Sequence, residues 1–529
     1  MAPWSCCANP FSTDMMAGVQ AMIRESAGDE WSYLKGRYHL PPKRLIDDYA
    51  LDNKQVLGRG MNGDVRLAVS RAHGRAVAVK SFKYPFFSSF TDLSKVKKSL
   101  ANELEIALQM DHPCMVRLLD VYESPRGIDM VMEYLTGGTL EEEMQLPASE
   151  ATDAGPTNSR RFAEADAASI ACDMLRALCY MHSHGLIHRD LKPGNFAYVN
   201  YLGERGMLKL LDFGFSTRHK EGELMRRACG TVPYLAPEVL RRSYDDEKCD
   251  IWSVGVIVFR LLIGRFPFGS SRDREDVLNT ILEGKYMEQV PKRWSRLSED
   301  ARDFLQGLLC VDPKSRLSAL HALNHPWIVG RGQRCQVQLS EMTFHGETFV
   351  DAVCKYAALQ PMKKLCVQLM VWSTVSDERQ QARQIFEALD RNRDGVCTVD
   401  EFRAMLSEDD KVPSERIEAA CNVIGGADEI AYSDIIGALI YFRRIAWNDR
   451  MLKYMFGNLA ETTSKGKGMY ITEESLRKMV GGELNGNPIE SVFAEIDKRA
   501  RGRVSYDDML EYILDESSDA SLSNQRSAI

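Results

Sequence analysis

Apolar residues recur with two different periods along this chain, and the change of period outlines its elements. Between Tyr49 and Val69, and again over Ala76–Lys80, apolar and polar residues alternate, which predicts β-strands. Helical spacing follows at Leu100–Met110 and at Phe162–His182, and it returns beyond residue 349. The pattern therefore predicts an α+β region followed by an all-α region.

Segments without a sustained period predict the boundaries of these regions. Residues 1–48 are expected to be an N-terminal extension, part of which docks on the next domain through aromatic residues such as Trp31 and Tyr38. The serine-rich residues 516–529 are expected to be a disordered tail. This leaves domains at 49–327 and 379–515, joined by a junction at 328–378.

Composition narrows the class of protein. A chain of 529 residues is too long for one hydrophobic core, and a net charge of −8 does not favour a general nucleic-acid binder. The longest apolar run, Ile251–Phe259, is far shorter than the roughly 20 residues that a membrane span needs. The thirteen cysteines are scattered, which favours reduced thiols in a cytoplasmic compartment. Cys6 and Cys7 are either acylated, with weak membrane association, or unmodified, while Ala2 excludes N-myristoylation.

A glycine-rich stretch lies inside the first pair of predicted strands. Gly58, Gly60 and Gly63 precede Val65 in a G-x-G-x-x-G-x-V motif, whose backbone can present N–H groups to phosphates. The motif alone also fits a plain hairpin. A dinucleotide-binding loop would need a helix at this point, where the sequence predicts a second strand instead.

Lys80 ends that second strand, and a buried lysine needs a partner that neutralises it. Glu103 on the predicted helix is the expected partner, because Glu105 lies two residues further and points to another face. This ion pair would hold Lys80 against the α- and β-phosphates of a nucleotide. The backbone of Glu133-Tyr134-Leu135, after a short apolar strand, is expected to hydrogen-bond an adenine edge.

Residues His188–Asn195 carry the strongest chemical signal. Asp190 offers a carboxylate for a hydroxyl proton, Lys192 an ammonium group, and Asn195 an oxygen ligand for a hard cation. Asp212, in Asp-Phe-Gly, supplies a second cation ligand. Together they predict a magnesium–phosphate site that faces a nucleophilic alcohol.

With Ala236-Pro237-Glu238, Arg316 and His325-Pro326-Trp327, these motifs resemble the eukaryotic protein kinase family over residues 49–327. The resemblance implies a bilobal α+β fold, in which Asp190 orients the substrate hydroxyl and Lys192 stabilises the moving phosphoryl group. It implies ATP contacts from Leu57, Gly58, Gly60, Gly63, Val65, Ala78, Lys80, Glu133 and Leu135.

The same resemblance implies that Asn195 and Asp212 hold Mg²⁺, that Glu238 pairs with Arg316 and that Asp250 anchors the catalytic loop. A pseudokinase is the alternative. The presence of the complete set stands against it, namely Lys80, Glu103, Asp190, Asn195 and Asp212.

Departures from other kinases bear on substrate choice and activation. Kinases that select basic substrates often carry acidic residues at the positions that here hold Thr139, Gly194 and Arg260, which predicts a weakened preference for upstream arginine. Glu141–Glu143 are partial substitutes. In the activation segment, Arg226-Arg227 stand where many kinases place a phosphothreonine, so activation by phosphorylation of this segment is not favoured.

Residues Asp390–Glu401 match the EF-hand calcium loop at every required position. Side-chain oxygens come from Asp390, Asn392, Asp394, Thr398 (through water) and Glu401, a carbonyl comes from Val396, and Gly395 allows the turn. Apolar stripes on both sides distinguish the loop from a solvated acidic turn.

Three further segments have the length of EF-hand loops but lack ligands: 423–434, 464–475 and 497–508. In the last, Arg499 and Arg501 replace oxygen ligands and are expected to form ion pairs across the loop. Residues 379–515 are therefore expected to form a calmodulin-like domain of four EF-hands, of which only the first is intact.

The order of kinase, junction and EF-hands is similar to that of the calcium-dependent protein kinases of plants and protists. This implies a monomeric serine/threonine kinase that uses ATP, Mg²⁺ and Ca²⁺ and acts on protein substrates. The junction would be autoinhibitory, and contact with the calcium-loaded module would release it; a linker that packs on the kinase is the alternative. Two rival functions stay open: a kinase with a largely calcium-insensitive structural or partner-binding module, and a non-catalytic scaffold.

Overall fold

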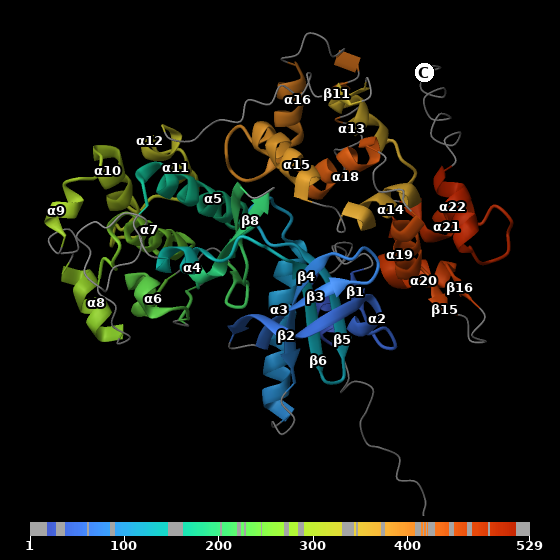
Figure 1. Cartoon of the computed structure of the whole chain (residues 1–529), viewed down its shortest axis with the longest axis horizontal. Helices are drawn as coiled ribbons and strands as arrows, with labels where there is room; N and C mark the ends of the chain where they lie inside the picture. Colours follow the sequence, from blue (N-terminus) through green and yellow to red (C-terminus); the bar gives the residue numbers. More distant parts are fainter. Residues whose placement is uncertain are drawn as a thin grey trace, which may run out of the picture.

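Two large hydrophobic cores organise the chain in the computed structural model, whose helices and strands are labelled in Figure 1. The first joins a β-sheet to the helices around it, and the second joins helices that follow residue 349. The structure describes residues 18–27, 37–60, 63–84, 90–146, 162–201, 204–219, 224–226, 229–244, 246–268, 274–283, 290–330, 343–344, 347–371, 376–407, 414–415, 417–418, 421, 429–443, 449–462, 468–484 and 487–514.

The first lobe is a six-stranded sheet in the order β1-β5-β6-β4-β3-β2. Its strands are β1 (Tyr38–His39), β2 (Tyr49–Gly60), β3 (Gly63–Ser70), β4 (Ala76–Lys83), β5 (Leu118–Ser124) and β6 (Gly127–Glu133). Neighbours are antiparallel except β1, which runs parallel to β5. Val77 and Val79 join a small core, whereas Phe82 joins the large core together with α3 (Phe90–Gln109). The alternation in the sequence thus produces a sheet that is packed on both faces.

Helices form the second lobe. At its centre α5 (Glu164–Ser183) packs against α7 (Lys248–Ile263), whose residues from Cys249 to Ile263 are all buried. Around them lie α4 (Leu140–Gln145), α6 (Pro237–Leu240), α8 (Arg274–Glu283), α9 (Pro291–Trp294), α10 (Glu299–Leu308), α11 (Ala319–Leu323) and α12 (Pro326–Val329). Strands pair as β7 (Leu186–Ile187) with β10 (Thr217–Arg218) and β8 (Phe196–Tyr201) with β9 (Glu204–Leu210). A helix that is buried all round gives the catalytic loop above it a rigid support.

The predicted N-terminal extension contributes to the first lobe. It provides α1 (Val19–Ala27), β1 and α2 (Leu45–Asp48), and β2 begins at the residue after α2. Tyr38 is buried, as expected of a docking aromatic residue, while Trp31 lies outside the described residues. The domain limits stay predictions, and Cys6, Cys7 and the tail 516–529 also lie outside the described residues.

The second core is helical. Its helices are α13 (Phe349–Ala357), α14 (Pro361–Val371), α15 (Ser376–Leu389), α16 (Val399–Ser407), α18 (Tyr432–Arg443), α19 (Asp449–Leu459), α20 (Glu473–Val480), α21 (Ile489–Ile496) and α22 (Tyr506–Leu514). α13 and α14, which fall in the predicted junction, both pack against α18. Short strand pairs lie between helices: β11 (Thr343–Phe344) with β12 (Glu347–Thr348), β13 (Cys397–Thr398) with β14 (Glu429–Ile430), β15 (Glu461–Thr462) with β16 (Met469–Tyr470), and β17 (Glu483–Leu484) with β18 (Asn487–Pro488).

The centres of the predicted EF-hand loops pair with one another. Cys397 of the first loop lies opposite Ile430 of the second, and Ile471 of the third exchanges two backbone hydrogen bonds with Val504 of the fourth. These contacts are the short ladders that connect paired EF-hand loops.

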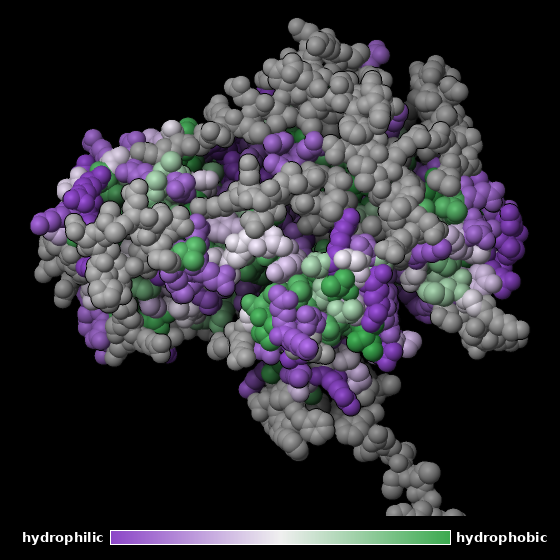
Figure 2. Space-filling view, in the orientation of Figure 1, coloured by the Kyte–Doolittle hydropathy of each residue, from purple (hydrophilic) through white to green (hydrophobic). Residues whose placement is uncertain are grey.

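The surface is mixed in polarity, with hydrophobic residues gathered on the first lobe in the view of Figure 2. Exposed apolar side chains of this lobe include Leu40, Ile46, Val56 and Val69. In the described part of the chain, no helix is both long and apolar enough to cross a membrane.

Candidate active site

The glycine-rich hairpin brings three predicted nucleotide contacts side by side. Gly58 on β2 lies opposite Val65 on β3, which in turn lies opposite Lys80 on β4. Gly63 has φ +139°, and a Cβ there would lie 2.0 Å from the carbonyl oxygen of Ser81. Only glycine fits this close approach. Leu57 is half-buried and Ala78 buried, and the tip of the hairpin, Met61-Asn62, lies outside the described residues.

Lys80 forms the ion pair that the strand and helix patterns predict. Its Nζ lies 2.7 Å from Glu103 Oε1 and 3.0 Å from Asp212 Oδ1, so it joins α3 to the Asp-Phe-Gly segment. Glu105, the alternative partner, lies 3.6 Å from Arg218 instead. Burial alone would lower the pKa of Lys80, but the charges of Glu103 and Asp212 raise it overall, so the ammonium form persists.

The catalytic loop gathers its charges around Asp190, which is 5% exposed. Lys192 Nζ lies 2.7 Å from Asp190 Oδ2, and the Thr231 hydroxyl donates to Asp190 Oδ1 at 2.8 Å. Asn195 donates from Nδ2 to the Asp190 carbonyl oxygen at 2.8 Å. That bond orients the amide, so the side-chain oxygen of Asn195 is the atom left for a cation.

A buried carboxylate supports this loop from below. Asp250 on α7 accepts hydrogen bonds from the amides of His188 at 2.8 Å and Arg189 at 2.9 Å. Burial would raise the pKa of Asp250, but hydrogen bonds and nearby charge from His182 and His188 hold it below its usual range. Asp250 therefore makes the contacts with the His188–Asn195 loop that its implied anchoring role requires.

The implied brace between Glu238 and Arg316 is also present. Arg316 Nη1 lies 2.6 Å from Glu238 Oε1, and Nη2 lies 3.1 Å from Oε2. Both side chains are buried, and such bidentate geometry fixes orientation as well as charge. It ties the end of the activation segment to the helical lobe.

The donor set fits Mg²⁺ and ATP. Although burial would raise its pKa, Lys80 lowers the pKa of Asp212, which keeps that carboxylate ionised. The side chain of Asp212 is 42% exposed, and it contacts Lys80, as Glu103 does. Glu133 uses its side chain on Lys209, at 2.6 Å, and on the amide of Arg117, at 2.8 Å. A contact between Glu133 and an adenine is therefore confined to its backbone, as for Leu135.

The activation segment is held by protein contacts. Arg189 donates from Nε to the carbonyl oxygen of Phe215 at 2.8 Å. Met225 pairs with Tyr244 through an isolated antiparallel bridge. Arg226 is exposed, and Arg227 lies outside the described residues. These contacts connect the described parts of the segment to the helical lobe, and the prediction that phosphorylation of this segment is not the switch stays a prediction.

Arg260 fills one of the positions at which the sequence departs from kinases that select basic substrates. Its guanidinium is buried, lies 4.3 Å from the centre of the Phe266 ring, and contacts the hydroxyl of Tyr234. Glu141 Oε2 lies 3.5 Å from Nη1. Thr139 caps α4 by accepting from the amide of Glu142 at 3.2 Å. The guanidinium of Arg260 therefore lies beside Tyr234. Tyr234 ends the short turn that follows Thr231.

The calcium loop Asp390–Glu401 has the turn that an EF-hand requires, with Gly395 at φ +85°. Glu401 accepts from the amides of Arg391 at 3.1 Å and Asn392 at 3.3 Å, and Asp394 accepts from the amide of Val396 at 2.9 Å. In the described part of the chain, no group of three or more His, Cys, Asp or Glu side chains is gathered for a metal ion. The carboxylates of the loop are instead engaged by its own amides.

One observation shows that the loop fits a cation. Asp390 Oδ1 is buried and has no hydrogen-bond partner in the described structure. Burial, and then the charges of Asp394 and Glu401, raise the pKa of Asp390 to about 7. A hard cation with oxygen ligands would satisfy this atom and neutralise the three carboxylates.

The loop also contacts the kinase region directly, which the sequence did not predict. A Cβ at Gly395 would lie 2.7 Å from the backbone nitrogen of Tyr180 on α5. Arg176 lies 2.9 Å from Glu387, and Arg383 lies 3.3 Å from Asp173. These four residues form an interlocked pair of ion pairs between α5 and α15. No local pattern signals this contact, because each residue reads as part of a solvated helix face.

Comparisons with known proteins agree with this geometry. The protein kinase domain family matches residues 51–328, and the EF-hand domain family matches residues 381–411. Calcium-dependent protein kinase 14 of Arabidopsis thaliana is 30% identical over 463 residues, covering 85% of this chain and 81% of that protein. Calcium-dependent protein kinase 13 of the same plant is 26% identical over 519 residues, covering 95% and 92%. Calcium-dependent protein kinase 20 of Oryza sativa subsp. japonica is 28% identical over 465 residues, covering 85% and 78%. With its assembled catalytic loop and its EF-hand, the chain belongs to the calcium-dependent protein kinase family and is a protein serine/threonine kinase.

Proposed function

We propose that Asp190 is the residue that orients a serine or threonine hydroxyl of a protein substrate and accepts its proton. The observation that carries this role is the position of Asp190, whose two carboxylate oxygens are held by Lys192 and Thr231. A carboxylate fixed in this way presents one rotamer to the substrate, which is the contribution that phosphoryl transfer most requires of a protein.

The other side chains divide the remaining tasks. Magnesium-bound ATP supplies the phosphoryl group when it is bound. Lys80, held by Glu103, neutralises phosphate charge, and Lys192 neutralises charge that develops during transfer. Asn195 and Asp212 provide the oxygen ligands for Mg²⁺. The hairpin around Gly58 and Gly63 covers the phosphates with backbone N–H groups.

We further propose that calcium acts by keeping the junction inside the EF-hand module. Met362, Leu365 and Cys366 of α14 are each 0% exposed in the second core, while Lys80 and Glu103 are paired in the first lobe. This combination supports a state in which the kinase is assembled while α14 packs in the second core. The end of α14 touches the first lobe in the described structure, where the carbonyl oxygen of Val371 accepts from Arg117 Nη2 at 2.9 Å. Loss of calcium would release α14 toward the kinase domain, where it inhibits.

One assay tests these roles. Phosphate transfer to a generic protein substrate is measured with and without calcium for wild type, Asp190→Ala and Glu401→Ala. Wild type is expected to be stimulated by calcium, Glu401→Ala to lose the stimulation, and Asp190→Ala to lose transfer under both conditions. Transfer that persists in Asp190→Ala would refute the catalytic assignment.

A structural clamp is the second candidate for the EF-hand module, and one observation favours it. The fourth loop is already neutralised internally, since Arg499 and Arg501 both pair with Asp508. A module of this kind stays folded without metal. Equal activity of wild type and Glu401→Ala at all calcium concentrations would select the clamp over the switch.

We also propose that the kinase acts as a cytoplasmic monomer with little preference for arginine upstream of its target. Buried cysteines such as Cys114, Cys179 and Cys249 are thiols and not disulfides, which supports a reducing compartment. The buried guanidinium of Arg260 supports the substrate preference, because it repels a second cation.

A peptide array measures this preference. Arg260→Glu is expected to raise phosphorylation of peptides with upstream arginine about tenfold, the factor that corresponds to 1.4 kcal/mol. Arg265→Glu, at an exposed position near α7, changes the net charge equally and is expected to leave the profile unchanged. A wild-type profile dominated by upstream arginine would contradict the assignment.

A further inference from the structure

The N-terminal extension is built into the lobe that positions Lys80. Helix α1 packs against α3, and Val19 and Ile23 are 0% and 2% exposed in the core that also contains Leu104 of α3. Leu104 directly follows Glu103, the partner of Lys80. A change in how α1 packs therefore acts on the helix that carries Glu103.

A buried carboxylate fixes the start of α1. Glu123 on β5 accepts hydrogen bonds from the amides of Val19 at 2.8 Å and Gln20 at 3.2 Å, and from the hydroxyl of Tyr38 at 2.8 Å. A Cβ at Gly18 would lie 2.8 Å from Glu123 Oε1, so the chain passes very close to the carboxylate. Glu123 is 8% exposed, and the donors found for it all come from the extension. Without the extension this carboxylate would lose these three hydrogen bonds.

A buried arginine then connects the extension to the end of α3. Arg37 donates from Nη2 to the carbonyl oxygen of Leu108 at 3.0 Å and from Nη1 to that of Leu118 at 2.8 Å. Its own carbonyl accepts from the amide of Val121 at 2.7 Å. Leu108 lies in the last turn of α3, where carbonyl groups lack helical partners. The extension thus holds α3 at its side and at its C-terminal end.

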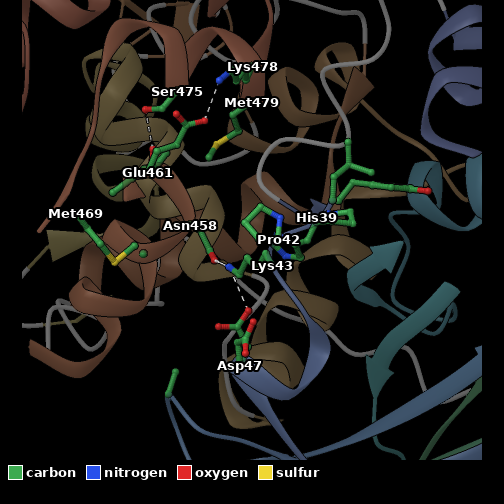
Figure 3. Close-up of a pocket in the computed structure, with 18 of the residues that line it drawn as sticks. His39, Pro42, Lys43, Asp47, Asn458, Glu461, Met469, Ser475, Lys478 and Met479 are labelled. Atoms are coloured by element: carbon green, nitrogen blue, oxygen red, sulfur yellow. Dashed lines mark hydrogen bonds and ion pairs between the residues drawn. The ribbon is translucent and has the colours of Figure 1, made fainter. Parts of the chain in front are cut away.

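The same extension contacts the EF-hand module. Lys43 Nζ lies 2.8 Å from Asn458 Oδ1 of α19 and 3.1 Å from Asp48, and Arg24 donates to the carbonyl oxygen of Lys478 of α20 at 3.3 Å. These contacts border a cavity of about 1350 Å³, which is lined mainly by the extension on one side and by residues of α19, α20 and their neighbours on the other, with Arg71 and Ala72 from the turn after β3 (Figure 3). The extension is therefore a part of the first lobe that meets α19 and α20.

We propose that Gly18–Asp48, through its described parts, is a positioning element of the kinase, which holds α3 so that Glu103 stays on Lys80 and which transmits the position of the EF-hand module to α3. Val19, Ile23 and Arg37 are its positioning residues, and Glu123 of β5 is the carboxylate that fixes the start of α1. None of them touches a substrate, and each acts through α3. The inference rests on the roles proposed above for Lys80 and Glu103.

The first experiment measures kcat and the KM for ATP of the full-length kinase at saturating calcium. Ile23→Asp places a carboxylate between α1 and α3 and is expected to raise the KM for ATP about tenfold and to lower kcat, because the Lys80–Glu103 pair loosens. Ile23→Leu is expected to keep wild-type values. Ala21→Asp introduces the same charge on the exposed face of α1 and is the matched control.

The KM for ATP separates positioning from general destabilisation. A kinase that is merely partly unfolded loses active molecules, which lowers the apparent kcat and leaves the KM for ATP unchanged. An unchanged KM in Ile23→Asp would overturn the proposal. If Ile23→Asp does not fold, Glu123→Gln replaces it with the same two outcomes, since it weakens the contact with α1 without placing a charge in the core.

The second experiment tests the link to the EF-hand module with a double-mutant cycle of Lys43→Met and Asn458→Leu. Each single variant is expected to reduce the calcium stimulation, and the double variant to reduce it no further. Additive effects would overturn the link. Lys80→Met serves as the reference variant. If Lys80→Met retains phosphate transfer, the proposed function fails. If Lys80→Met loses transfer while Ile23→Asp keeps the wild-type KM for ATP, only this inference is overturned.

Discussion

The first and the predicted fourth EF-hand loops share a backbone conformation and differ in charge. Both have positive φ at their fourth and sixth residues: Arg393 at +63° and Gly395 at +85° in the first, Ala500 at +48° and Gly502 at +67° in the fourth. In both, the first aspartate accepts from the amide of that glycine, at 3.2 Å for Asp390 and 2.6 Å for Asp497. The two loops therefore make the same turn, around a glycine at the same position.

The side chains have opposite needs. In the first loop, burial and the neighbouring carboxylates of Asp394 and Glu401 raise the pKa of Asp390 to about 7, a charge pattern that a bound cation would balance. In the fourth, Arg499 lies 3.2 Å from Asp508, and Arg501 contacts the same carboxylate. Burial would raise the pKa of Asp508, but Ser505 and these arginines lower it overall. The same loop backbone can therefore be neutralised in two ways. A bound cation would supply the positive charge in the first loop, and Arg499 and Arg501 supply it in the fourth.

Removal of the bidentate ligand of the first loop is expected to have the largest effect on calcium binding. Glu401→Gln is expected to weaken calcium binding by the full-length protein on the order of 100-fold, because it removes a charge and chelation together. Asp508→Asn, at the corresponding position of the fourth loop, is the matched control and is expected to leave calcium affinity unchanged. Isothermal titration measures both, and equal losses would show that the fourth loop also binds calcium.

The loss of calcium binding should also appear in stability. At a calcium concentration of 100 Kd, wild type is expected to gain about 2.7 kcal/mol in free energy of unfolding of the EF-hand module. Glu401→Gln is expected to gain almost nothing at that concentration. Urea unfolding with and without calcium measures the difference, and an equal gain in both proteins would place the stabilising ion elsewhere.

Replacement of the arginines of the fourth loop by oxygen ligands tests whether charge alone distinguishes the two loops. The combined change Arg499→Asn, Arg501→Asp and Asp508→Glu replaces the internal cations with oxygen ligands on a backbone that already has the required turn. The number of calcium ions bound at saturation is expected to rise from one to two. A stoichiometry that stays at one would show that the backbone of this loop is not sufficient.

The smallest effect is expected from the ion pairs of the fourth loop themselves. Arg501 is 41% exposed, and exposed pairs contribute at most about 1 kcal/mol. Arg501→Met is expected to lower the calcium-free stability of the module by no more than this amount, and Arg501→Lys by less. A larger loss in urea unfolding would mean that the internal cations are required for folding.

Local patterns predicted much of the catalytic lobe. The alternation over Ala76–Lys80 and the helical spacing around Glu103 predicted the ion pair between Lys80 and Glu103. The strand and helix periods fix the face on which each of these side chains lies. The ligand spacing of Asp390–Glu401 likewise predicted a turn with Gly395 at positive φ. The prediction of ion pairs across the fourth loop is also confirmed by the contacts of Arg499 and Arg501 with Asp508. These features depend on residues that are near in sequence or on motifs with a fixed geometry.

The contacts between regions were decided by the tertiary structure. Nothing in the sequence around Glu123 indicates that it meets the start of α1, more than a hundred residues away along the chain. The same holds for Arg383 with Asp173 and for Gly395 with Tyr180, which bring the calcium loop onto α5. Such pairings depend on how whole elements pack, and many surface residues have the same local chemistry. The sequence therefore sufficed to predict the candidate catalytic and calcium-binding groups of this kinase, because they lie in motifs of fixed spacing. How the N-terminal extension and the EF-hand module reach these groups depends on the packing of distant elements, which the sequence does not reveal.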